Sequence, residues 1–81
     1  MIYIQVIKES VSTGVKECLF QGENEQFHRA LDVLADKKEE FEAYDWNYKV
    51  NSLIRDGYEY YYRFTMRPDE KRKWQSEVVY R

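Results

Sequence analysis

His28 is the first residue whose neighbours have a spacing that could support chemistry. It follows Glu25 by three residues and precedes Asp32 by four, so a helix would place its imidazole beside both carboxylates. Such a group can act as a general base or as half of a metal site. Catalysis would also require a nucleophile or oxyanion donors, and the pattern around His28 supplies neither. We therefore interpret His28 as a titrating surface residue and predict no catalytic residue.

A further group of carboxylates follows at Glu39, Glu40, Glu42 and Asp45. Carboxylates act as general acids and bases when a pocket shifts their pKa values, but the outside of a helix offers no pocket. A chain of 81 residues also has little room for a substrate cavity of ~300 Å³ beside its own core. The sequence therefore predicts a protein that is not an enzyme.

Metal and cofactor sites need residues that this chain lacks. A zinc site takes several ligands, mostly Cys and His, whereas the sequence contains one cysteine and one histidine. Its three glycines, Gly14, Gly22 and Gly57, are too far apart to form a phosphate-binding loop. We expect no metal and no cofactor.

The single cysteine, Cys18, indicates the redox conditions of the cellular compartment in which the protein works. It cannot form an internal disulfide, which fits a reducing interior, and its place in a strand-like run favours a buried, inert thiol. No apolar run approaches the ~18 residues of a membrane span, and no basic segment precedes an apolar one as in a secretory signal. We expect a cytoplasmic protein that does not bind a membrane.

Charge is distributed unevenly along the chain. Ten acidic and five basic residues in 1–45 give −5, whereas five acidic and eight basic residues in 46–81 give +3. The acidic charge gathers on the outer side of a predicted helix, at Glu25, Asp32, Asp36 and Glu39. A charged surface of this kind steers partners of the opposite sign. These four residues are the predicted binding site for a protein with a basic surface.

An alternative site combines an exposed tyrosine with cations: Tyr61, Arg63, Arg67, Lys71, Arg72 and Lys73. A flat side chain beside arginines can stack a base, so this set would bind single-stranded nucleic acid. The near-neutral net charge of −2 counts against it, because phosphate binding depends on many cations. A third alternative is a homodimer formed through an edge strand or through the aromatic hairpin that Trp46–Ile54 and Tyr58–Met66 are predicted to form.

The elements that position these residues begin with a hairpin and a helix. Ile2–Lys8 and Val15–Phe20 are expected to be strands joined by a turn at Ser10–Gly14. A helix is predicted from about residue 24 to about residue 43, capped by Gly22 or Asn24. Its expected sheet-facing residues are Phe27, Ala30, Leu31, Leu34 and Phe41.

A second hairpin is predicted from Trp46–Ile54 and Tyr58–Met66. A loop of Arg55, Asp56 and Gly57 would pair Ile54 with Tyr58, Ser52 with Tyr60, Val50 with Tyr62, Tyr48 with Phe64 and Trp46 with Met66. This register collects apolar groups on one face, so we expect it in place of a two-residue turn, with Gly57 at positive φ. Tyr58, Tyr60, Tyr62 and Phe64 would then belong to the core, and Tyr61 would face solvent.

The last element is predicted to be a short helix that begins at Pro68, although Gln75–Tyr80 also fits a short edge strand. The order β-β-α-β-β plus this element predicts one α+β domain over 1–81. We expect two layers, an antiparallel sheet of four or five strands and one long amphipathic helix. The leading functional prediction is a non-enzymatic accessory or inhibitor protein, which acts by occupying a partner's surface. Compact charged proteins of this length are common among phage and mobile-element accessory proteins, but no residue of the sequence establishes that origin.

Overall fold

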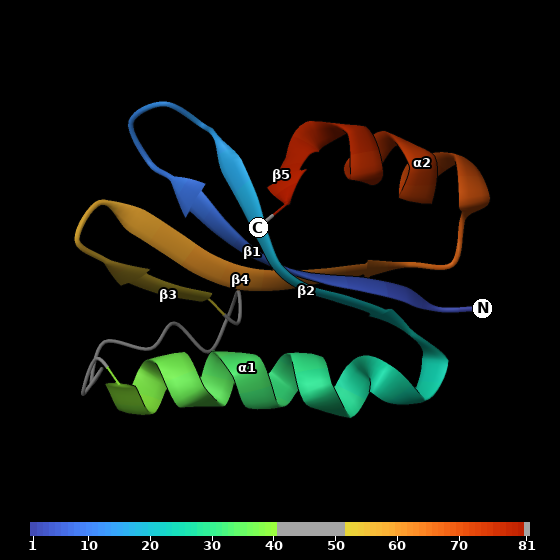
Figure 1. The fold of residues 1–81 in the computed structure, drawn as a ribbon, viewed down its shortest axis with the longest axis horizontal. Helices are drawn as coiled ribbons and strands as arrows, with labels where there is room; N and C mark the ends of the chain where they lie inside the picture. The colour runs from blue at the N-terminus through green and yellow to red at the C-terminus, as the bar shows by residue number, and fades with distance from the viewer. Residues whose placement is uncertain (41–51, 81) are drawn as a thin grey trace.

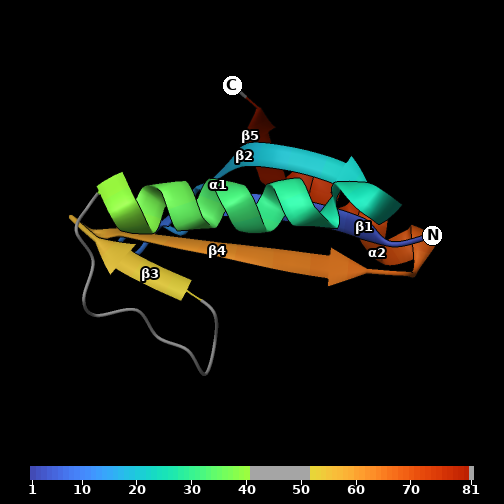
Figure 2. The same ribbon diagram turned by 90° about the horizontal axis from the view of Figure 1, so that it is seen from below.

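The sheet and its two helices are described for residues 1–40 and 52–80 in a computed structural model. The elements are β1 (Tyr3–Ser10), β2 (Lys16–Glu23), a short 3-10 turn (Asn24–Gln26), α1 (Phe27–Glu40), β3 (Ser52–Arg55), β4 (Tyr58–Thr65), α2 (Pro68–Glu77) and β5 (Val78–Tyr80). The sheet has the strand order β3-β4-β1-β2-β5. Figures 1 and 2 show α1 on one face of this sheet and α2 on the other. The predicted α+β class is confirmed, with a second helix layer added.

The central strand β1 is antiparallel to both β2 and β4. Because helices cover both of its faces, residues 3–7 are all buried. Ile4 and Val6 pack toward α1, whereas Ile7 packs with Cys18 and Val78 on the face of α2. The predicted hairpin of the first two strands is therefore confirmed, and so is the burial of Cys18.

The fifth strand makes the sheet mixed, so the expectation of a purely antiparallel sheet was wrong. β5 is parallel to β2, with Glu17 opposite Val79. The chain leaves β4, crosses the sheet as α2 and reaches the far edge beyond β2, as Figure 1 shows. A crossover of this kind joins parallel strands, whereas a tight turn joins antiparallel ones. The C-terminal segment thus holds both predicted alternatives, a helix that begins at Pro68 and a short edge strand.

The start of the helix differs from the predicted cap at Gly22 or Asn24. Glu23 is the cap residue, and its N–H donates to Oε1 of Gln26 at 2.9 Å. Asn24 instead joins the helix start to the first strand, because its N–H donates to the carbonyl of Ile2 at 2.8 Å and its side-chain oxygen accepts from the N–H of Ile2 at 3.1 Å. The helix is described as far as Glu40, so Phe41 and its predicted end near residue 43 lie outside the described residues.

The buried side of α1 is centred on Ala30 and Leu34, as predicted. Phe27 and Val33 pack at the borders of the same core. Leu31 was expected there too, but 40% of its surface is exposed. At about 100° per residue, Leu31 lies about 100° around the helix axis from Ala30, so it falls outside the buried arc once that arc turns toward Val33.

The second hairpin closes through a two-residue turn, so the predicted three-residue loop was wrong. The pairs are Arg55 with Tyr58, Ile54 with Glu59, Leu53 with Tyr60 and Ser52 with Tyr61. Asp56 and Gly57 have φ of 51° and 82°. Two positive φ values define the turn whose twist matches paired strands, and Asp-Gly suits it. The positive φ of Gly57 is confirmed, and the pairs proposed for Trp46, Tyr48 and Val50 lie outside the described residues.

The aromatic residues of β4 divide between the two faces as the alternation predicts. Tyr60, with 6% of its surface exposed, and Tyr62 pack against the core beneath α1. Tyr58 and Phe64 share this face but remain 37% and 53% exposed, so the prediction that they belong to the core was wrong. They lie near the two ends of the strand, which runs from Tyr58 to Thr65.

Candidate functional site

The four carboxylates predicted to bind a partner lie on the outer side of α1 and in the 3-10 turn that precedes it. Glu25, Asp32, Asp36 and Glu39 are all exposed. Among the ion pairs that join described residues, none uses any of the four. Because Ala30 and Leu34 anchor the opposite side of the helix, these carboxylates project from a packed element. We call this set the acidic face.

His28 lies on the same exposed side of the helix. In the described parts of the chain, no group of three or more His, Cys, Asp or Glu side chains is arranged to hold a metal ion. A hollow of about 100 Å³ lies on the other face of the sheet, beside Met1, Tyr3, Met66 and Pro68. It is smaller than the ~300 Å³ at which small-molecule sites begin.

Tyr61, the predicted stacking residue of the alternative site, is not free on the surface. It is half-buried on the face of α2, and its hydroxyl donates to Oε1 of Glu9 at 2.8 Å. Burial, followed by this hydrogen bond, raises the pKa of Tyr61 well above its ordinary value. The expectation of an exposed ring was wrong, because the crossover by α2 and β5 covers the sheet face that carries it.

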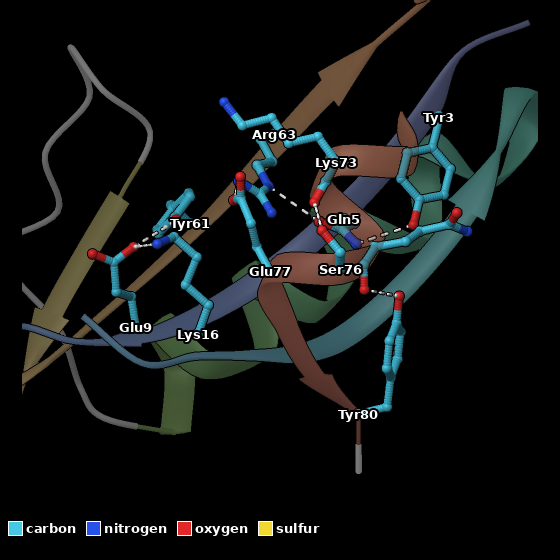
Figure 3. Close-up of polar contacts among 11 residues, drawn as sticks. Tyr3, Gln5, Glu9, Lys16, Tyr61, Arg63, Lys73, Ser76, Glu77 and Tyr80 are labelled. Atoms are coloured by element: carbon cyan, nitrogen blue, oxygen red, sulfur yellow. Dashed lines mark hydrogen bonds and ion pairs between the residues drawn. The ribbon is translucent and has the colours of Figure 1, made fainter. Parts of the chain in front are cut away.

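Arg63 is held even more closely (Figure 3). Its Nε donates to Oε1 of Gln5 at 3.1 Å, and its Nη1 lies 3.3 Å from Oε2 of Glu77. Its guanidinium also lies 4.5 Å from the ring centroid of Trp74. These contacts join β4 to the central strand and to α2. A side chain with three partners inside the fold is poorly placed to meet a nucleic acid.

A chain of hydrogen bonds continues from Arg63 across the sheet. Nε2 of Gln5 donates to the hydroxyl of Tyr3 at 3.0 Å, and that hydroxyl donates to Oε1 of Gln21 at 2.9 Å. Sequence reasoning missed this network. The signal was Gln5 itself, a polar residue within the apolar first half of β1, which is 0% exposed and therefore needs partners.

The remaining cations of the alternative site are spread along α2 and its approach. Arg67 bonds Asp69 at 3.1 Å, and Nζ of Lys71 bonds Glu23 at 2.8 Å while lying 5.1 Å from the ring centroid of Tyr3. Arg72 and Lys73 are exposed. The structure therefore does not bring Tyr61, Arg63 and the exposed cations together in one open groove.

The comparisons with known proteins give no family for this arrangement. No family model, no curated protein and no solved structure matches the chain. Within residues 1–40 and 52–80, no helix is long and apolar enough to cross a membrane. The functional argument therefore depends on the surface geometry alone, and the acidic face is its most distinct element.

Proposed function

We propose that this protein is a small, non-enzymatic, cytoplasmic binding module, an accessory or inhibitor that covers a basic surface on a protein partner. The observation that carries the proposal is the acidic face: Glu25, Asp32, Asp36 and Glu39 are exposed together along one side of a helix whose other side is packed on the sheet.

The physical support comes from the fixed presentation of these charges. Asp32 and Asp36 are one helical turn apart, and Glu39 follows after almost another turn, so the three carboxylates form a row along α1. Because the helix is already packed, little further conformational entropy is lost when these charges meet a complementary surface. Their long-range attraction also speeds association with that surface.

Binding of single-stranded nucleic acid receives less support. Two of its six residues, Tyr61 and Arg63, are engaged with Glu9, Gln5, Glu77 and Trp74 inside the fold. A base could reach these side chains only after α2 had moved, and the net charge of −2 gives no overall attraction for phosphates.

The test is a charge reversal of the acidic face, Asp32→Lys with Asp36→Lys. Both positions are exposed, so the free energy of unfolding should change by no more than about 0.5 kcal/mol. Tagged parent and variant proteins should be compared for partner capture from lysate after crosslinking. We expect the parent to retain a partner, the variant to lose it, and the association rate of the parent to fall with salt.

The matched control is Asp69→Lys with Glu70→Lys, which makes the same charge change on the opposite face of the sheet, at the start of α2. This control should still capture the partner. Equal capture by the parent and the Asp32/Asp36 variant would contradict the proposal. So would tight binding of a labelled single strand that weakens steeply between two salt concentrations and is lost in Tyr61→Ala.

A further inference from the structure

An apolar strip lies at the border between α1 and β4. The ring of Phe27 meets those of Tyr62 and Phe64 edge-on, with both centroids 5.8 Å away. Phe64 is 53% exposed, and Leu31, one turn along the helix from Phe27, is 40% exposed. We call these four residues the apolar seam. Exposed apolar side chains that are scattered singly are ordinary, whereas neighbouring ones indicate an interaction surface.

The seam borders the acidic face on one side only. At about 100° per residue, the directions around α1 run from Phe27 through Leu31 and Ala35 to Glu39, Asp32 and Asp36. Beyond Asp36 the same rotation reaches Arg29 and then Val33, which packs at the border of the core. The outer surface of α1 therefore changes from apolar at the seam to acidic along Glu39, Asp32 and Asp36.

The apolar seam next to the acidic face indicates which kind of partner fits this surface, and the inference rests on the proposed function. We propose that the partner presents a basic amphipathic helix, which lies beside α1 with its apolar residues on the seam and its Lys and Arg residues on the acidic face. Charge complementarity selects a cationic ligand, and the exposed Leu31 and Phe64 require that ligand to carry an apolar face as well.

The spacing of the charges favours a helix over an extended strand. Asp32, Asp36 and Glu39 extend about 10 Å along α1, at intervals of about one helical turn. A partner helix packed alongside can present cations at the same spacing along its own axis. An anionic lipid surface could also cover apolar residues, but its negative charge would be repelled by the carboxylates of the acidic face. A second copy placed with its own acidic face on this one would also be repelled.

The probe is a synthetic peptide of about 18 residues, five helical turns, with leucines at helical spacing and lysines beside them. Its control has the same composition in an alternating order, which cannot form an apolar helical face. Isotope-labelled protein is titrated with each peptide. We expect amide shifts at Leu31, Asp32 and Phe64, and binding at least tenfold tighter for the helical peptide.

Variants separate this inference from the proposed function. Leu31→Ser and, on the neighbouring strand, Phe64→Thr should each weaken binding of the helical peptide at least tenfold, with thermal melts to verify folding. Val11→Ser, at an exposed apolar position in the first hairpin, is the matched control and should bind as the parent does.

Equal binding of the two peptides would overturn the inference, and so would unchanged binding of the helical peptide by both seam variants. In either case the proposed function would still hold if Asp32→Lys with Asp36→Lys lost partner binding. Self-association of the parent protein that Leu31→Ser abolishes would assign the seam to a second copy and would also overturn it. Unchanged binding by the charge-reversed variant would instead contradict the acidic face itself.

Discussion

The guanidinium of Arg63 lies 4.5 Å from the ring centroid of Trp74, and this contact joins β4 to α2. This contact is important because none of the ten residues of α2, all of which the structure describes, is buried. The helix is instead attached through half-buried Trp74, the pair of Arg63 and Glu77 at 3.3 Å, and the pair of Lys71 and Glu23 at 2.8 Å. Polar contacts thus close the second face of the sheet.

Trp74→Ala should therefore loosen α2 selectively. Loss of the ring removes its packing on Tyr3 and its attraction for Arg63, so the free energy of unfolding should fall by about 2 kcal/mol. Hydrogen exchange should accelerate more in α2 than in α1. Arg72→Ala, an exposed position on the same helix, should leave both measurements unchanged. Equal acceleration in the two helices would contradict the assigned attachment.

Two leucines of α1 provide a matched comparison of buried and exposed positions. Leu34 is 2% exposed and Leu31 is 40% exposed. Leu34→Ala should lower the free energy of unfolding by about 2–5 kcal/mol, because it removes core contacts and leaves a cavity. Leu31→Ala should cost less than about 1 kcal/mol. Chemical denaturation measures both, and equal costs would show that the buried arc of α1 is assigned incorrectly.

Gly57→Val should destabilise the second hairpin through the backbone alone. No atom lies within 4 Å of a Cβ built at this glycine, but its φ of +82° is one that β-branched residues resist. We expect a loss of more than about 1 kcal/mol in thermal or denaturant unfolding. Asp56→Asn keeps a residue that tolerates positive φ and should be nearly neutral. A neutral Gly57→Val would be inconsistent with the two-residue turn.

Tyr61 should make the fold sensitive to alkaline conditions. Burial, then its hydrogen bond to Glu9 and the charge of Glu9, raises the pKa of Tyr61 above the ordinary value of 10.0. The unfolded chain therefore loses this proton first, so the stability contributed by neutral Tyr61 is complete below about pH 10 and is lost as the pH rises toward the folded pKa. Denaturation from about pH 9 to about pH 11 should show a shallower fall in Tyr61→Phe than in the parent. Tyr58→Phe, at the exposed end of the same strand, is the control, and identical curves for all three proteins would refute the role of Tyr61.

The local elements followed from the sequence because their signals lie within a few residues of one another. The alternation of β1, the amphipathic period of α1, the proline that begins α2 and the glycine that accepts positive φ each act over one turn or one strand. The exposure of Glu25, Asp32, Asp36 and Glu39 followed in the same way, since the side of a helix opposite its apolar residues must face solvent.

Tertiary structure decided which faces distant segments cover. Leu31 became exposed because the sheet selects the exact arc of α1 that it buries, and Tyr61 and Arg63 became enclosed because α2 crosses two strands to deliver β5 beside β2. The register of β3 was set by the backbone twist of Asp56 and Gly57 and not by the grouping of apolar side chains. The exposure of Leu31 and the enclosure of Tyr61 and Arg63 depend on contacts between residues far apart in the chain, whose geometry no local pattern encodes. The turn at Asp56 and Gly57 is a local signal, which the grouping of apolar side chains had been expected to outweigh. The acidic face was therefore readable from the sequence, whereas the apolar seam beside it exists only in the folded protein.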